Sequence, residues 1–232
     1  MGHLGVAMSL VNSAVLLVFV LLTTGYLMIF LRRKMAENLR SPGSGVLGNI
    51  AIQMMTKVNR KTSEDAAQRL NIQSGETVVE LGPGFGWGLR ASLAFSPERL
   101  VGVEISQTFR NALSASDIAQ SIELRSDDAR DLSAFLEKGS VDKILAVNVI
   151  YFLTPLAEYA REIKRILDSD GIALLACKFD LVRNADTSVF ANIEPEKIKE
   201  VFNTQGLSVR EEQVDLGNPK VSYLALWVTH QK

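Results

Sequence analysis

The segment that most constrains the fold of this chain is an apolar run that contains an acid and continues into three alternating glycines. The run is Val78–Leu81 with Glu80 inside it, and Gly82, Gly84 and Gly86 follow. Glycine is required where the backbone takes unusual φ/ψ values or must come within contact distance of a ligand. A helix that starts after such a turn directs its free N–H groups at whatever lies above the loop. The segment therefore predicts a buried strand, a sharp turn and a helix that together bind a nucleotide-type ligand.

Apolar runs alternate with helical patterns along the chain, as expected of a parallel sheet with crossover helices. Five strands are expected, over Thr77–Leu81, Leu100–Val103, Ile122–Arg125, Lys143–Val147 and Ile172–Cys177. Helical patterns lie between them near Leu89–Phe95, Thr108–Ala119, Leu132–Glu137 and Pro155–Leu167. One or two lead-in helices are expected between residues 48 and 70, with an inner face made of Ile50, Met54, Val58 and Leu70.

The end of the chain breaks this alternation. After a helical pattern near Pro195–Thr204, two strand-like runs follow, Leu207–Val214 and Val221–Val228. Only residues 215–220 separate these runs, which is too short for a crossover helix, so the last strand should be antiparallel to its neighbour. The expected fold is therefore α/β, a doubly wound, seven-stranded, mostly parallel sheet with an antiparallel C-terminal strand.

The N-terminal segment differs in composition from the rest. No charged residue occurs between Leu4 and Leu31, and Arg32–Lys34 follow at once. As a helix, this stretch would be about 42 Å long, which exceeds the hydrocarbon core of a bilayer, about 30 Å. A cleaved signal peptide fits poorly because Met1–His3 contains no lysine or arginine, and a core helix would show a polar face. We therefore expect one transmembrane helix that anchors a single-pass membrane protein, with its catalytic domain in the cytosol.

Three parts follow from this division. Residues 1–34 are the expected anchor with its basic flank, residues 35–47 are a linker, and residues 48–232 are the α/β domain. The linker contains Ser41–Gly45, which is flexible by composition.

The overall composition excludes several classes of partner. The chain has 25 basic and 26 acidic residues, so no global field favours nucleic acid. Its two histidines, His3 and His230, lie at opposite ends, and Cys177 is the single cysteine. A zinc site or other metal centre is therefore not expected. A single thiol also excludes an internal disulfide.

The spacing of the glycines discriminates between nucleotide ligands. A dinucleotide fingerprint requires G-x-G-x-x-G, and counting from Gly82 or Gly84 places Trp87 or Leu89 at the third glycine. No Walker-type Gly-Lys-Ser/Thr is present either. The pattern that stands here is E-x-G-x-G-x-G, beginning at Glu80.

From residue 75 to residue 171 the chain resembles the class I, seven-strand, Rossmann-like S-adenosylmethionine-dependent methyltransferases. Five segments carry the resemblance in the family's order, namely Glu80–Gly86, Leu100–Glu104, Ser126–Leu132, Val141–Ile150 and Glu162–Gly171. The resemblance implies S-adenosylmethionine as the cofactor and methyl transfer as the activity.

The resemblance also implies a role for individual residues. The cofactor's methionine part is expected against Glu80, Gly82, Gly84 and Gly86, and its ribose hydroxyls against Glu104. A carboxylate can accept from both hydroxyls of a ribose diol. Asp128 is expected to meet the adenine amino group, with Asp127 as the second choice.

The fourth-strand segment is expected at the transfer site. There Asn148 is expected to contact both cofactor and acceptor, and Tyr151 is a second catalytic candidate, for which packing at the strand-to-helix turn is the alternative. No acid/base pair stands out, which agrees with methyl transfer because positioning of the reactants can supply much of the catalysis.

Two observations bear on the methyl acceptor. The stretch Asn148–Tyr151 lacks the prolines that adenine- and amide-directed methyltransferases carry there, which counts against a nucleobase or glutamine acceptor. The long connection 178–192 contains Phe179, Arg183 and Phe190, which would suit an anionic amphiphile, although a solvated loop explains it as well. We expect a lipid or apolar small-molecule acceptor at a membrane. A protein lysine on a membrane neighbour, or a non-catalytic cofactor-binding module, remains as an alternative.

Overall fold

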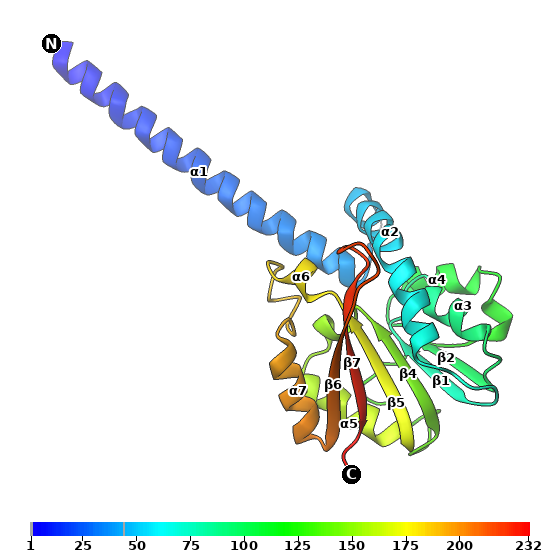
Figure 1. Cartoon of the computed structure of the whole chain (residues 1–232). Coiled ribbons are helices and arrows are strands. Elements are labelled where there is room, and N and C mark those ends of the chain that lie inside the picture. Colours follow the sequence, from blue (N-terminus) through cyan, green and yellow to red (C-terminus); the bar gives the residue numbers. More distant parts are fainter. Residues whose placement is uncertain (1, 44) are drawn as a thin grey trace.

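A seven-stranded sheet forms the centre of the molecule (Figure 1). The computed structural model describes the backbone of residues 2–43 and 45–232 and the side chains of residues 17–43 and 45–232. The strands are β1 Thr77–Leu81, β2 Arg99–Val103, β3 Glu123–Arg125, β4 Val141–Val147, β5 Leu167–Cys177, β6 Leu207–Val214 and β7 Tyr223–His230. Their spatial order is β3-β2-β1-β4-β5-β7-β6.

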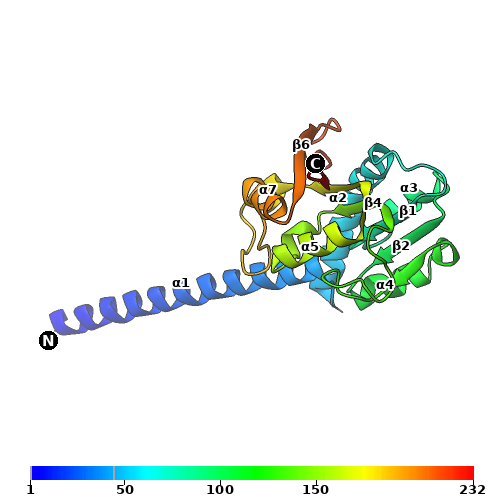
Figure 2. The same cartoon turned by 90° about the horizontal axis from the view of Figure 1, so that it is seen from below.

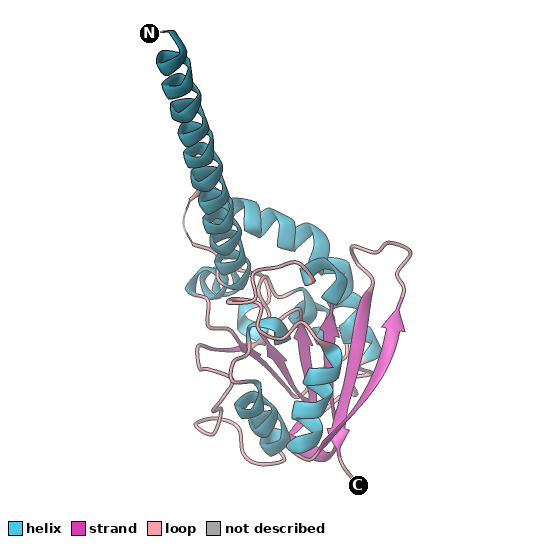
Figure 3. Ribbon diagram, turned by 90° about the vertical axis from the view of Figure 1, so that its left-hand side faces the viewer, coloured by secondary structure: helices cyan, strands magenta, loops and turns pink. Residues whose placement is uncertain are grey.

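The helices lie in the connections between these strands. They are α1 Gly2–Arg40, α2 Val46–Arg69, α3 Trp87–Leu93, α4 Gln107–Ser114, α5 Leu156–Ile166, α6 Phe179–Val182 and α7 Pro195–Thr204. Two 3₁₀ turns, η1 Ala119–Ser121 and η2 Ile150–Phe152, complete the described elements. Figure 3 shows the shorter helices packed around the central sheet, while most of α1 extends away from it.

The sheet confirms the topology expected from the sequence. Strands β1 to β5 pair in parallel, and β7 is antiparallel to both β5 and β6. The eight-residue connection before β7, residues 215–222, is the cause, because it allows a hairpin and no crossover. All parallel strands therefore end at one edge of the sheet, where α/β proteins build their binding sites.

Side chains that alternate along each strand enter one of two cores, one on each face of the sheet. Val79 of β1 belongs to the same core as Ile163 of α5 and Phe202 of α7, whereas Val78 belongs to the core that contains Ala66 of α2 and Leu89 of α3. Because both faces are covered, the central strands are apolar on both sides, which explains their unbroken apolar runs. The two cores hold the parallel strand ends in fixed register.

Helix α1 projects from this body along most of its length (Figure 2). Only its C-terminal end is built into the domain, where Ala36 is buried. Arg32 donates to the backbone oxygen of Asn184, and Thr108 Oγ1 donates to Pro42 O at 2.8 Å just beyond the helix. The end of α1 is thereby attached both to α4 and to the chain after β5.

The prediction of a transmembrane helix is wrong. Within the described residues, no helix combines the length and the apolar character that crossing a membrane requires. The predicted span began at Leu4, but the side chains of residues 1–16 lie outside the described residues. From Leu17 onward the helix continues without a break through Arg32–Lys34 to Arg40, so charged turns belong to the same helix. The prediction of a single-pass membrane location, with the catalytic domain in the cytosol, depended on that helix and is wrong as well.

Two further local expectations are corrected. Residues 132–137 form turns and no helix, and Leu132 N donates to the carboxylate of Glu162 at 2.7 Å. On α2, Ile50 and Met54 are 41% and 50% exposed, so they do not form an inner face. Ala51 and Ala66 do so, because small side chains let the helix approach its neighbours closely.

The contact at Glu162 generates a stability prediction. The side chain is buried, accepts the Leu132 N–H and pairs with Arg165 at 2.7 Å. Glu162→Ala leaves a buried N–H without an acceptor and should lower the free energy of unfolding by about 2–3 kcal/mol. Urea unfolding measures this change.

The matched control is Arg161→Ala, an exposed position on the same helix, which should shift stability by less than about 0.5 kcal/mol. Equal losses in the two variants would show that the Glu162 contact is not a stabilising one.

Candidate functional site

A cleft of about 130 Å³ opens at the carboxyl edge of the sheet. Strands β1, β2 and β4 end at its floor, and α2 and the end of α1 cover it. Seven of the residues predicted from the sequence line it together, Glu80, Gly82, Gly84, Glu104, Asp127, Asp128 and Asn148. Gly86 supports the turn from outside the lining, and Tyr151 lines an adjoining pocket.

The glycine turn takes the backbone conformation for which glycine is needed. Gly82, Gly84 and Gly86 all have positive φ, at 65°, 55° and 76°. A Cβ at Gly82 would lie 2.5 Å from Val149 Cγ2, and one at Gly86 would lie 2.5 Å from Leu113 Cδ2. A Cβ at Gly84 would meet no protein atom within 4 Å. Gly82 and Gly86 are therefore required by packing, whereas Gly84 leaves open space on the side of the cleft.

Glu104 holds the turn in place from the end of β2. Its Oε2 accepts from Gly84 N at 3.0 Å and its Oε1 from Ser106 N at 2.8 Å. Burial raises the pKa of this carboxyl, and the two backbone N–H groups and Arg110 oppose the rise. Each oxygen keeps a further acceptor position, so the carboxylate can fix the turn and still bind donors in the cleft.

Glu80 lies opposite, within β1, and is less well satisfied. Its carboxylate accepts from Leu89 N, and Oε2 is buried with no hydrogen-bond partner in the described structure. Burial, with a smaller contribution from the Glu104 charge, raises the pKa of Glu80 to about 8. Gly88 gives this side chain its room, because a Cβ there would lie 2.4 Å from Oε1. The cleft thus contains a buried acid that would be stabilised by a cation.

The two aspartates follow β3. Asp128 pairs with Arg130 at 2.9 Å and also hydrogen-bonds Tyr159. Burial works to raise the pKa of Asp128, but the bonds from Arg130 outweigh it and the net shift is downward. Asp127 lies 3.9 Å from Arg125 Nε. Both carboxylates line the cleft, and Asp128 is the one held by several partners.

Asn148 stands at the end of β4 with φ 56°, a left-handed conformation that asparagine tolerates better than most residues. Its Nδ2 donates to Asn59 Oδ1 at 3.0 Å, and its Oδ1 accepts from Tyr151 OH at 3.1 Å and from Lys178 N at 3.2 Å. The side chain thereby ties together β4, α2 and the chain after β5.

Tyr151 is buried against Phe152, Phe179 and Phe190. Its hydroxyl donates to Asn148 and accepts from the backbone N–H of Lys178. Burial raises the pKa of this hydroxyl well above its ordinary value. The phenol therefore holds two strand ends together and forms the wall of the pocket next to the cleft.

Sequence reasoning missed the residues that cover the site. Met55, Asn59 and Ser63 reach the cleft from α2, and Leu39 and Arg40 reach it from the end of α1. No local pattern marks them, because their helices precede the sheet and meet the strand ends only in the folded chain.

Comparison with known proteins shows what this domain is similar to. Residues 79–175 match the family profile described as a methyltransferase domain, and the match runs from β1 into β5. This stretch is similar to a methyltransferase domain. The match covers less than half of the 232 residues, and no curated protein is significantly similar in sequence.

Solved structures extend the likeness to the rest of the domain. A protein assigned as a methyltransferase, in complex with the Haloferax volcanii Trm112 methyltransferase activator, is 21% identical, with a TM-score of 0.63 over 78% of this chain and 93% of that chain. An S-adenosylmethionine-dependent methyltransferase from Aquifex aeolicus is 13% identical, with a TM-score of 0.60 over 76% and 96%. The [4+2]-cyclase SpnF is 14% identical, with a TM-score of 0.62 over 74% and 80%.

At these identities the structural likeness shows the fold, which is the class I methyltransferase fold expected from the sequence. The matched domain and its neighbours imply S-adenosylmethionine as the cofactor. No cluster of histidine, cysteine and acidic side chains suited to a metal ion occurs among the described residues.

The buried acid Glu80 generates a pH prediction for the cofactor-free protein. Its pKa is raised on folding, so the folded state keeps its proton while the unfolded chain loses it above about pH 4.5. Stability should therefore fall as the pH rises from 5 to 8. Glu80→Gln removes this loss. The difference in free energy of unfolding between Glu80→Gln and the wild type should therefore be about 3–4 kcal/mol more in favour of the variant at pH 8 than at pH 5.

Urea unfolding at both pH values measures the difference. Glu98→Gln, at an exposed position before β2, is the matched control and should show no such pH dependence. A Glu80→Gln effect of the same size at pH 5 and pH 8 would contradict a raised pKa.

Proposed function

We propose that the protein is an S-adenosylmethionine-dependent methyltransferase whose methyl acceptor is an apolar small molecule, lipids included. One observation carries the proposal: a second, largely apolar pocket adjoins the cofactor cleft. The two cavities share five lining residues, Leu39, Met55, Asn59, Asn148 and Phe152. A cofactor site that opens directly into an apolar cavity is the arrangement that transfer to an apolar acceptor requires.

The cleft residues fit the cofactor that the domain implies. The buried and unpartnered Oε2 of Glu80 is suited to the cofactor's ammonium group, since the ion pair would satisfy an orphaned acceptor. Open space at Gly84 admits the methionine part between Gly82 and Gly86. Glu104 has acceptor capacity left for the ribose hydroxyls.

The remaining assignments follow the same logic. Asp128 is already oriented by Arg130 and Tyr159, so we assign it to the adenine amino group, with Asp127 beside it as the alternative. Asn148 lines both cavities and lies where cofactor and acceptor would meet. Its side chain is held by three partners, so it can position reactants without rearranging.

S-adenosylmethionine, when bound, supplies an electrophilic methyl group on a sulfonium. The protein's part is to hold the acceptor in line with that methyl group and to exclude water. Phe152 and Leu153 line the cleft near Asn148, and Phe85 packs edge-on against Phe109 at 5.0 Å. These side chains make the transfer site apolar.

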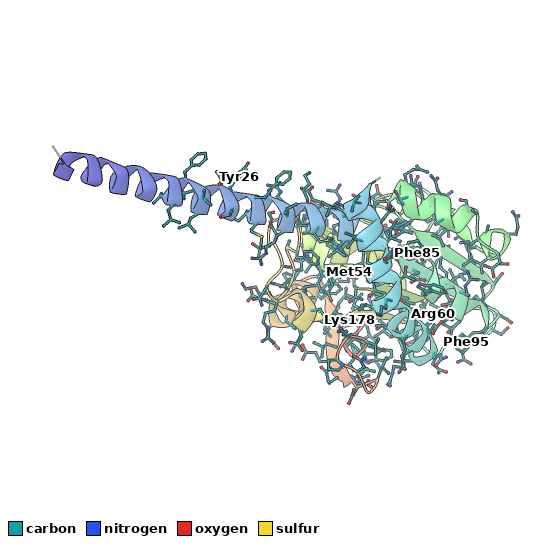
Figure 4. The ribbon with its side chains drawn as sticks, turned by 90° about the horizontal axis from the view of Figure 1, so that it is seen from above. Tyr26, Met54, Arg60, Phe85, Phe95 and Lys178 are labelled. Atoms are coloured by element: carbon teal, nitrogen blue, oxygen red, sulfur yellow. The ribbon has the colours of Figure 1, made fainter. Side chains whose placement is uncertain are left out.

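The acceptor pocket has a volume of about 190 Å³ and lies between α2, η2 and the chain after β5. Figure 4 labels Met54 and Lys178, which line it from α2 and from the start of the loop after β5. Its other walls include Val58, Val182 and Phe190. Met54 and Leu181 are half exposed and form its rim, which leaves an entrance for a small molecule.

A direct test supplies the purified full chain with cofactor labelled in its methyl group and an extract of the source cells. We expect label in the organic-soluble small molecules, and its loss in Glu104→Ala. Label confined to protein bands would favour a protein side chain as acceptor. No transfer together with no binding of S-adenosylmethionine or S-adenosylhomocysteine would sink the proposal.

The pocket rim generates a mutational prediction. Leu181→Glu places a carboxylate at the entrance and should lower transfer to apolar acceptors at least tenfold, because the charge must lose water when the acceptor enters. Binding of S-adenosylhomocysteine, measured by calorimetry, should stay within twofold of the wild type.

Val46→Glu is the control, since Val46 is an equally apolar, exposed residue that lines neither cavity. If both variants keep wild-type transfer rates, the acceptor does not enter at Leu181.

A further inference from the structure

Lys178 is the one lysine among the residues that line the acceptor pocket. It follows the last residue of β5 and is 5% exposed. Its Nζ donates to Val58 O at 2.7 Å and lies 3.4 Å from Asn59 Oδ1. Both acceptors are neutral amide oxygens. An ammonium has three donors, so one N–H remains for a ligand.

This ammonium has no carboxylate partner in the described structure. Four acids line the pocket on the other side of the β5 end, and each has other partners. Asp180 pairs with Arg183, Glu194 with Lys197 and Glu196 with Lys199, and Asp215 accepts from Gly217 N and Ser222 Oγ. Burial alone lowers the pKa of Lys178 to about 8, which is the shift expected of a cation without a counter-charge. A buried charge of this kind is costly unless something pairs with it.

The position of the charge relates it to the transfer site. Asn59, which accepts from Lys178, also accepts from Asn148, and both asparagines line the cofactor cleft as well as the acceptor pocket. The cationic end of Lys178 therefore lies at the junction of the two cavities, while the remaining pocket wall is mostly apolar.

We propose that Lys178 binds the methyl acceptor through an ion pair, and that the acceptor is an apolar molecule whose reacting group is an acidic oxygen, a carboxylate or a phenolate. The inference rests on the proposed methyl transfer and names the acceptor class of that same site.

Methyl transfer to such an anionic oxygen needs no proton acceptor. A lone pair of the anionic oxygen forms the new C–O bond to the methyl carbon, and the electrons of the breaking C–S bond remain on sulfur. The positive sulfonium and the negative oxygen both become neutral, giving a methyl ester or ether and S-adenosylhomocysteine. This explains why the pocket holds a cation and no general base such as a histidine or a carboxylate among the residues that line it.

The test measures binding of octanoate and of octanol to the full chain saturated with S-adenosylhomocysteine. The two probes share one apolar chain and differ in charge. We expect saturable octanoate binding at least tenfold tighter than octanol binding. Lys178→Met should abolish this preference, and Lys178→Arg, which keeps the charge, should retain most of it.

Two controls separate the possible failures. Lys57→Met removes an exposed lysine from α2 and should leave both affinities unchanged. The affinity for S-adenosylhomocysteine in Lys178→Met should stay within twofold of the wild type, which reports an intact cofactor site.

Equal binding of the two probes by the wild type, or undiminished octanoate binding by Lys178→Met, overturns the inference while the proposed function stands. The wild-type comparison holds even if Lys178→Met does not fold. If the wild type binds no S-adenosylhomocysteine, the proposed function itself has failed.

Discussion

The site depends on the burial of two carboxylates at neighbouring strand ends. Glu80 lies in β1, Glu104 follows β2, and the parallel register brings both to one edge of the sheet. Each carboxylate must be satisfied from within the protein because water is largely excluded. Glu104 receives two backbone N–H groups, one from the glycine turn, whereas Glu80 receives only that of Leu89. Glu104 therefore maintains the turn, and Glu80 remains available to a cationic ligand.

The same contrast between satisfied and unsatisfied charges extends to the acceptor side. Asn148 donates to Asn59 and accepts from Tyr151, and this set of hydrogen bonds connects α2 with η2 at the junction of the two cavities. Lys178 is attached to this set through Asn59 but has no counter-charge. Glu80 would bind the cofactor and Lys178 would bind the acceptor, so the two reactants would be held at opposite ends of one continuous cavity. Preorganisation of this kind is a principal source of rate acceleration in transfer reactions.

The elements that the sequence predicts well are those whose pattern is local and repeated. The bounds expected for β1, β6 and α7 agree with the structure. Pro195 marks the start of α7, and Gly206, with φ 80°, separates α7 from β6. The seven predicted cleft residues come together because the strand ends of a parallel sheet do so in every such fold. Local pattern fails where a distant partner decides the structure. Leu132 is held in a turn by Glu162, thirty residues away, and Asn59 reaches Asn148 across eighty-nine residues. At the N-terminus, the basic residues Arg32–Lys34 were expected to flank the end of a membrane helix, whereas α1 continues through them into the domain and ends at Arg40.

In the proposed methyltransferase, Glu80 is the protonated acid of the free cleft and becomes the ionised partner of the cofactor's ammonium. Calorimetry of S-adenosylhomocysteine binding at pH 7, in buffers that differ in ionisation enthalpy, counts the protons exchanged on binding. With a pKa of about 8 in the free protein, Glu80 should release nearly one proton when the ligand binds. The release should disappear in Glu80→Gln, which should bind more weakly. Binding without proton release in the wild type, or identical release in both proteins, would contradict the account.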